Sequence, residues 1–269
     1  MNVASLEDYL FGLFPRSTAE PWDHVGLSVG DPASEISRVA VALDATPATV
    51  DEAASQGANV LLTHHPVYIK APDAFVPEPG TYPQASATIY RAAQAGVSII
   101  SMHTNLDRAP DARERMAEAL GLTCTGSLEA PCDNTAPGLG GIANTTTPEP
   151  LSIWAERAAK AFATEPRVWG NPAHMVSRVA LLGGSLSDLG ELAFQQGADV
   201  IICGEAGYHV CQDLTARGCS VVLLGHDASE YPFVDILVKV AQDAGVAAQD
   251  IVTMNHSRQW WTAREGIRG

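Results

Sequence analysis

Basic residues are scarce in this 269-residue chain, where 16 Lys and Arg stand against 31 Asp and Glu and give a formal net charge of −15. No run of Lys or Arg could follow a phosphate backbone, so nucleic acid is not an expected partner. Long apolar runs are also missing, because no stretch approaches the roughly 18 residues that a membrane helix requires. We therefore expect neither nucleic acid nor a membrane as a partner.

Cysteine pairs of the C-x-x-C type are absent as well, and the five cysteines form an odd set. Several lie in apolar stretches, such as Cys203 at the end of residues 200–203, and we interpret them as reduced core thiols. The N-terminal residues lack the positive segment followed by an apolar segment that marks a secretory signal. Together these features predict a cytoplasmic protein.

Short apolar segments alternate with helical patterns along most of the chain. Strands are expected at residues 38–43, 60–63, 97–102, 179–182, 200–203 and 221–224. Helices are expected at residues 5–14, 46–56, 85–95, 112–120, 189–196, 210–217 and 232–244. Ser5 with Asp8 resembles a capping box, and Thr46 before Pro47 resembles a helix start. This alternation is typical of the α/β class, with a parallel or mixed sheet flanked by helices.

Two segments of the chain resemble each other, namely Gln56-Gly-Ala-Asn-Val-Leu-Leu-Thr-His and Gln196-Gly-Ala-Asp-Val-Ile-Ile-Cys-Gly. Each is followed by a predicted helix and another strand. The repeat predicts two similar α/β lobes, residues 1–125 and 126–269, that together form one compact unit. A Gly, Pro and Thr-rich stretch at residues 124–150 lies at the expected boundary. Gln-Gly-Ala is also a common way for a helix to end, and that alternative stays open.

Residues with metal-ligating side chains follow three of the predicted strands. They are His64 and His65 after residues 60–63, His103 and Asp107 after residues 97–102, and His226 and Glu230 after residues 221–224. Ligands of α/β proteins bind beyond the carboxyl ends of the strands, where these side chains are expected to gather. Neutral imidazole and carboxylate suit zinc, iron, manganese or cobalt, and a bridging carboxylate lets two ions share one site.

Each of these residues also has a simpler interpretation. A histidine at a strand end can cap a helix, and Asp107 or Glu230 can be an ordinary solvated carboxylate. The combination of His-His, His-x-x-x-Asp and His-x-x-x-Glu at three strand ends is what favours a metal centre.

Four segments carry a resemblance to a known family: Trp22-Asp-His-Val-Gly-Leu, Thr63-His-His-Pro, His103-Thr-Asn-Leu-Asp and Gly225-His-Asp-Ala-Ser-Glu. In this order they resemble the signatures of the Nif-three-like dinuclear metal-centre family, also called the GTP cyclohydrolase 1 type 2 family. Further matches are Ala42-Leu-Asp-Ala-Thr and Gly204-Glu-Ala-Gly-Tyr-His. The resemblance runs from about Ser5 to the last predicted helix.

The resemblance implies two divalent metal ions per chain, either zinc, iron or manganese. By it, His64 and His65 bind one ion each, Asp107 binds one, His226 binds one, and Glu230 bridges both. It also implies two similar lobes facing across a metal cleft and a homohexamer assembled as a trimer of dimers. No P-loop occurs, so no nucleotide cofactor is expected.

The resemblance further implies a metal-dependent hydrolase that acts on a cyclic amidine. Its substrate would be GTP, opened at C8 of the guanine to give formate and dihydroneopterin triphosphate. His103 and His209 are the candidate catalytic residues for proton transfer, although His209 can also be a packing residue between the lobes. Basic residues near the first-lobe motifs number only three, Lys70, Arg91 and Arg108, which is a thin supply for a triphosphate.

The chain departs from the family pattern at two places. Asp227 stands where an aromatic residue or histidine is usual, and residues 111–115 replace a usual Gly-Asn-Asp segment. Two other functions stay open: a non-catalytic metal-binding ring that acts as a scaffold or regulator, and a dinuclear hydrolase of a phosphoester or a cyclic amide. Neither the metal nor the physiological substrate follows from the sequence.

Overall fold

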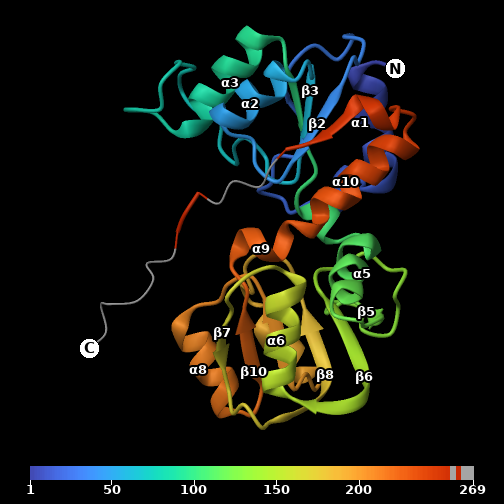
Figure 1. The fold of residues 1–269 in the computed structure, drawn as a ribbon, viewed down its shortest axis with the longest axis vertical. Helices are drawn as coiled ribbons and strands as arrows, with labels where there is room; N and C mark the ends of the chain where they lie inside the picture. Colours follow the sequence, from blue (N-terminus) through green and yellow to red (C-terminus); the bar gives the residue numbers. More distant parts are fainter. Residues whose placement is uncertain (255–258, 262–269) are drawn as a thin grey trace.

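Two sheets covered by helices make up the computed structural model, which describes residues 1–254 and 259–261. In Figure 1 one sheet with its helices lies above the other, and helix α10 (Pro232–Asp243) runs from the lower lobe into the upper one. The predicted α/β class is therefore confirmed. Within the described residues, no helix has the length and apolar character needed to cross a membrane.

The first sheet has the strand order β1-β4-β3-β2-β11. Its strands are β1 (Gly26–Val29), β2 (Val39–Ala42), β3 (Val60–Thr63), β4 (Ser98–Ser101) and β11 (Ile251–Thr253). Four of them pair in parallel, and β1 runs antiparallel to β4 at one edge. Every residue of β2, β3 and β4 is buried, because helices cover both faces of the sheet.

Different helices cover the two faces of this first sheet. On one face, α2 (Pro47–Ser55) and α3 (Gln84–Ala95) pack with Leu61 and Ile99. On the other face, α1 (Val3–Leu13) and α10 pack with Leu62 and Ile100. The alternation of these neighbouring residues between the two faces follows from the period of two in a strand.

The cap predicted for one helix is confirmed, and the cap predicted for another is wrong. Thr46 caps α2 with its side chain, and Pro47 takes the first turn, as predicted. The capping box of Ser5 with Asp8 is wrong, because α1 begins earlier and is capped by Asn2. The side-chain oxygen of Asn2 accepts a hydrogen bond from the backbone N–H of Ser5 at 2.9 Å.

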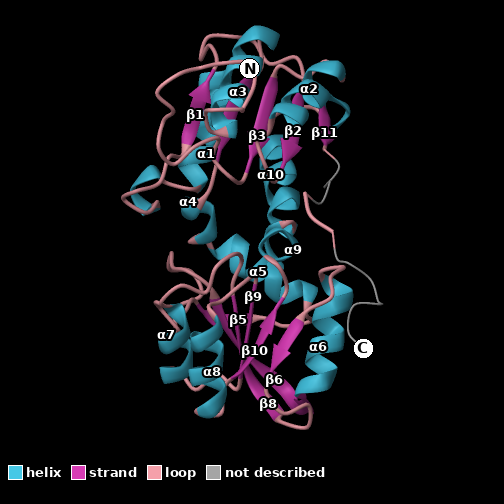
Figure 2. Ribbon diagram, turned by 90° about the vertical axis from the view of Figure 1, so that its left-hand side faces the viewer, coloured by secondary structure: helices cyan, strands magenta, loops and turns pink. Residues whose placement is uncertain are grey.

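The second sheet has the strand order β5-β6-β8-β9-β10-β7. Its strands are β5 (Cys124–Gly126), β6 (Gly141–Pro150), β7 (Arg167–Trp169), β8 (Met175–Leu181), β9 (Val200–Cys203) and β10 (Ser220–Leu223). The central strands β8, β9 and β10 are parallel, and β6 and β7 flank them antiparallel. Figure 2 shows one sheet above the other along the long direction of the molecule.

Helices also cover both faces of the second sheet. On one face, α7 (Leu189–Gln195) and α8 (Tyr208–Ala216) pack with Ile201 and Val221. On the other face lie α5 (Pro110–Ala119) and α6 (Leu151–Ala161), which contribute Met116 and Trp154. In Figure 2, α7 and α8 lie on the opposite side of the lower sheet from α6. Met116 and Trp154 belong to the same buried cluster as Leu62 of the first lobe, so one apolar core continues between the lobes.

The repeat seen in the sequence occupies equivalent places in the two lobes. Gly57 and Gly197 end helices α2 and α7 with φ of +76° and +77°, and β3 and β9 follow them as central parallel strands. Glycine is favoured there because it adopts the left-handed conformation without steric strain. The predicted ranges 60–63 and 200–203 coincide with β3 and β9.

The predicted division into residues 1–125 and 126–269 is wrong at two points. Residue 125 lies inside β5, which belongs to the second sheet, and α5 already packs on that sheet. At the other end, α10 and β11 return to the first lobe, where β11 extends the sheet beside β2. The apolar face of α10 and the parallel pairing of β11 with β2 place both elements in the first lobe. Nothing in the sequence of either element indicates which lobe it joins.

Candidate metal centre

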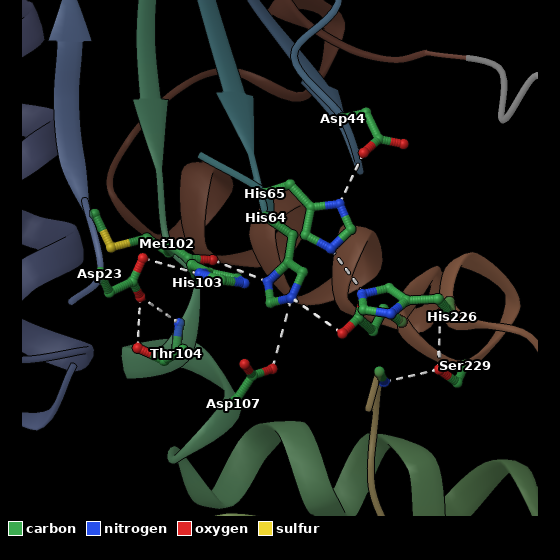
Figure 3. Close-up of polar contacts among 12 residues, drawn as sticks. Asp23, Asp44, His64, His65, Met102, His103, Thr104, Asp107, His226 and Ser229 are labelled. Carbon is green, nitrogen blue, oxygen red and sulfur yellow. Dashed lines mark hydrogen bonds and ion pairs between the residues drawn. The ribbon is translucent and has the colours of Figure 1, made fainter. Parts of the chain in front are cut away.

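The carboxyl ends of strands from both sheets meet between the lobes, and the predicted ligands lie there (Figure 3). His64 and His65 follow β3, and Asp107 ends the short helix α4 (Thr104–Asp107) after β4. His226 and Glu230 begin and end α9 (His226–Glu230), which follows β10 of the second sheet. Their i, i+4 spacing brings both side chains to one face of α9.

The Glu230 carboxylate is the centre of the cluster. Its Oε2 lies 2.8 Å from Nε2 of His65 and 3.2 Å from Nε2 of His226, and its Oε1 lies 3.9 Å from Nε2 of His64. Its side chain is 5% exposed, so these imidazoles take the place of water around it. Glu230 therefore joins ligands of the first lobe to those of the second.

A glycine beside Glu230 leaves room for this carboxylate. Gly184 has a φ of +60°, and a Cβ there would lie 2.3 Å from Oε1 of Glu230. Its backbone N–H donates to Ser229 Oγ at 2.9 Å, and Ser229 Oγ donates to the His226 carbonyl at 2.7 Å. The close approach of the backbone to the cluster therefore requires glycine.

The His64 ring carries a nitrogen without a hydrogen-bond partner. The ring is fully buried, and its Nδ1–H donates to the backbone carbonyl of Met102 at 2.9 Å. Its Nε2 is then the unprotonated nitrogen, and it makes no hydrogen bond among the described residues. The nearest carboxylate oxygen is Asp107 Oδ1, at 3.5 Å. A buried lone pair between two carboxylates is the arrangement expected of a ligand to a cation.

Acceptors behind the other histidines orient them in the same way. Nδ1 of His65 lies 2.7 Å from Asp44 Oδ1, and Nδ1 of His226 lies 3.1 Å from Glu205 Oε1. Such outer acceptors fix the tautomer of a metal-ligating histidine and direct its Nε2 toward the ion. Asp44 and Glu205 have no role predicted from the sequence, although both lie in segments that carry the family resemblance.

His103 is held similarly, by a residue that the sequence analysis missed. Its Nδ1 lies 2.9 Å from Oδ1 of Asp23, whose Oδ2 accepts from the Thr104 backbone N–H at 3.0 Å. Burial alone would raise the pKa of Asp23, but hydrogen bonds from His103 and Thr104 outweigh it and lower the pKa to about 2. Asp23 is therefore a carboxylate that stabilises and orients the His103 ring.

Three groups of side chains lie close enough to hold a metal ion. They are His64, Asp107 and Glu230; His65, His226 and Glu230; and His64, His65 and His103. In each group the potential ligand atoms lie within 4.8 Å of one another. The first two groups contain all five predicted ligands and share Glu230, so the residues present fit a metal centre.

Protons occupy this cluster when no ion is bound. Burial alone lowers the pKa of His65, but hydrogen bonds with Asp44 and Glu230 outweigh it and raise the pKa to about 10. The hydrogen bond with Glu230 raises the pKa of His226 to about 9. Burial alone would raise the pKa of Glu230, but its contacts with the histidines lower it well below the usual value. The metal-free site is therefore a carboxylate between two imidazolium groups.

The pKa values of Asp107 and His64 shift toward their neutral forms. Burial and the nearby Glu230 charge raise the pKa of Asp107 to about 7. Burial lowers the pKa of His64, which keeps the ring neutral as a ligand must be. An ion would replace the protons of His65, His226 and Asp107.

Metal loading at pH 7 is therefore expected to release about two to three protons per chain, because His65 and His226 are protonated there and Asp107 is about half protonated. Apparent metal affinity therefore rises as pH increases from 7 to about 10, because the metal-free site loses the protons of Asp107, His226 and His65 over this range. Calorimetric titrations with zinc in buffers of different ionisation enthalpy measure the number. Release of less than one proton would contradict this description of the site.

Of the predicted catalytic residues, the structure brings only His103 to the cluster. His209 is exposed on α8, where its ring contacts Tyr208, and it lines none of the cavities beside the cluster. The predicted catalytic role of His209 is not supported in this chain, because the first turn of α8 directs it to solvent. Asp227 lies at the edge of the cluster, where its Oδ2 accepts from Nε1 of Trp260 at 3.1 Å.

Fold and site together define a two-lobed α/β protein with a histidine–carboxylate cluster between the lobes. A family model described as Duf34/NIF3 (NGG1p interacting factor 3) matches residues 1–258. The chain belongs to this Duf34/NIF3 family, as its sequence motifs indicate.

Relatives and solved structures agree with this assignment. A "GTP cyclohydrolase 1 type 2 homolog" of Streptomyces coelicolor is 33% identical over 84% of this chain and 81% of its own length. One of Clostridium acetobutylicum is 27% identical over 95% and 97%. The crystal structure of Staphylococcus aureus protein SA1388 has a TM-score of 0.86 at 23% identity and covers 98% of this chain and 99% of its own. A Bacillus cereus protein related to NIF3 has a TM-score of 0.82 at 20% identity, with the same coverage.

Proposed function

We propose that this protein is a metal-dependent hydrolase whose site would hold two divalent ions, with Glu230 shared between the two ligand groups. The observation that supports it is the pair of ligand groups that share this carboxylate, one with His64 and Asp107 and the other with His65 and His226. Two such ions supply an activated water as nucleophile and a Lewis acid for the bond under attack. Zinc, iron and manganese all suit the ligand set.

The residues beside the ligands suit proton transfer. His103 belongs to a group with His64 and His65 in which the nitrogens lie within 4.8 Å, so its ring lies next to the reacting atoms. Asp23 binds its Nδ1, which leaves Nε2 as the nitrogen that exchanges a proton with substrate or water. In this role His103 is the general acid or base of the reaction, oriented by Asp23.

We propose GTP as the first candidate substrate, because the names of the relatives refer to it. The Streptomyces coelicolor and Clostridium acetobutylicum relatives are both called homologs of GTP cyclohydrolase 1 type 2. The corresponding reaction here is attack at C8 of guanine, release of formate and closure to dihydroneopterin triphosphate. Cyclic amides are the second candidate class, favoured by the scarcity of available cations around the cluster.

Formate release from GTP by the metal-reconstituted protein is the direct test. We expect turnover that rises with bound metal, measured by an enzymatic formate assay beside the metal content of the same sample. A fully loaded protein that releases no formate excludes the cyclohydrolase reaction. A screen of cyclic amides and phosphoesters then decides between another hydrolase and a binding role.

A further inference from the structure

A cavity of about 670 Å³ adjoins the metal ligands. His103, Asp107, His226 and Glu230 form part of its wall. Apolar side chains form another part: Ile69, Met116, Leu139, Leu182, Leu189 and Phe233. The volume lies within the range that binds a small organic molecule. A substrate that reaches the cluster through this cavity contacts its wall, so the chemistry of the wall bears on the substrate class.

The two arginines in this wall are already engaged by other groups of the protein. Arg108 and Arg113 are the only Lys or Arg among the lining residues that the structure describes. One guanidinium nitrogen of Arg108, Nη1, donates to Glu129 Oε2 at 2.6 Å, and the other, Nη2, donates to Glu20. Both carboxylates line the same cavity, so a substrate anion would have to displace one of them. Both terminal nitrogens of Arg108 therefore already donate to carboxylates, which compete with a phosphate for the guanidinium.

The second arginine is largely occupied by the protein itself. Arg113 is 2% exposed, and its Nε and Nη2 donate to the side chain and backbone of Asn134 and to the Ala136 carbonyl. Its Nη1 is buried and has no hydrogen-bond partner among the described residues. The wall thus offers little exposed positive charge to a triphosphate, which requires several cationic donors.

Large apolar side chains are instead exposed at the cavity. Trp22 is 55% exposed and Ile69 is 48% exposed, and both line it. The indole of Trp22 meets the His103 ring edge to face, with 6.0 Å between centroids. A partly exposed indole beside a candidate catalytic residue is an anchor for a planar or apolar ligand, because its burial on binding is favourable.

We propose that this cavity binds an uncharged planar cyclic amide, placed against Trp22 and Ile69, and discriminates against polyanions such as nucleoside triphosphates. The proposal rests on the hydrolase function above and takes cyclic amides, the second candidate class there, in place of GTP as the substrate class of the same site. Glu20 and Glu129 act as specificity residues, because they occupy Arg108 and add negative charge to the wall. Trp22 supplies the attractive contact.

Equilibrium binding to the metal-loaded protein tests whether the cavity discriminates against polyanions. The probes are inosine and inosine triphosphate, which differ only in the phosphates, with 5-phenylhydantoin and dihydrouracil as further uncharged cyclic amides. We expect wild type to bind inosine at least as tightly as its triphosphate. Glu129→Gln frees Nη1 of Arg108 and is expected to shift the ratio toward the triphosphate about tenfold. Glu149→Gln is the matched control, since Glu149 pairs with Arg157 away from the cavity.

The contact with Trp22 has its own test. Trp22→Ala is expected to weaken binding of the uncharged probes about tenfold, and Trp22→Phe to restore most of it. Phe75→Ala is the control, because Phe75 is 56% exposed but does not line this cavity. An unchanged affinity in Trp22→Ala would remove Trp22 from the proposal.

Two outcomes would overturn the proposal: binding of inosine triphosphate more than about tenfold tighter than inosine by wild type, or no binding of any uncharged probe. Turnover of the same probes separates this result from the proposed function. Uncharged probes that bind without hydrolysis contradict the hydrolase but not the cavity. Hydrolysis of a polyanion contradicts the cavity but not the hydrolase.

Discussion

Replacement of Glu230 with glutamine is expected to reduce bound metal from about two ions per chain to one or fewer, and to reduce turnover by at least about 100-fold, an effect that loss of an outer-shell partner alone can reach. The reason is that Glu230 belongs to both of the ligand groups that contain carboxylates. An amide in its place carries no charge. Its NH₂ group would face Nε2 of His65 or His226, which lie 2.8 and 3.2 Å from Oε2 of Glu230.

Elemental analysis of dialysed protein measures this effect, and Glu149→Gln is again the control. Circular dichroism of both variants shows whether the fold is kept, since Glu230 is buried and its replacement removes the carboxylate that His65 and His226 share. A correctly folded Glu230→Gln protein that retains two tightly bound ions would exclude the bridging role.

Asp23→Asn is expected to lower kcat roughly 100-fold while the metal content stays unchanged. The Asp23 carboxylate accepts from His103 on one oxygen and from Thr104 on the other, so the amide of asparagine must oppose a donor on one side. It either displaces the His103 ring or forces the other tautomer. The turnover is measured with whichever substrate the hydrolysis screen identifies.

The double variant distinguishes a positioning role of Asp23 from a structural one. If Asp23 acts through His103, then His103→Gln combined with Asp23→Asn loses no more activity than His103→Gln alone. The pH dependence of kcat should also lose the same limb in both single variants. Additive losses, or a pH profile that Asp23→Asn leaves intact, would show that Asp23 only maintains the fold.

How much of this site the sequence predicts depends on how local the signal is. His64, His65, Asp107, His226 and Glu230 each lie just beyond an apolar segment, and the rule that ligands gather at strand ends brings them together without a structure. The outer residues Asp23 and Asp44 lie far from their partners along the chain. Their role depends on how close their side chains lie to His103 and His65 in the fold, and the spacing of residues along the sequence does not predict that distance.

The fold shows the same division between local and non-local information. Strands β3 and β9 are continuous apolar segments between clear helix ends, and their ranges are predicted correctly. The antiparallel strand β6 is missed because residues 144–150 are largely polar and none of them is fully buried, so that pairing with β8 determines their conformation. The pairing of β11 with β2 joins segments more than 200 residues apart, and a segment of three residues does not indicate its partner.

The return of α10 and β11 to the first lobe has a consequence for synthesis on the ribosome. The first sheet cannot gain its outermost strand, nor the helix that covers one of its faces, until almost the whole second lobe has been translated. His226 and Glu230 directly precede α10, so the same late segment carries the ligands and closes the sheet. A nascent chain that ends before residue 232 thus has an incomplete first lobe, and the first lobe does not correspond to a continuous fragment that could be excised intact.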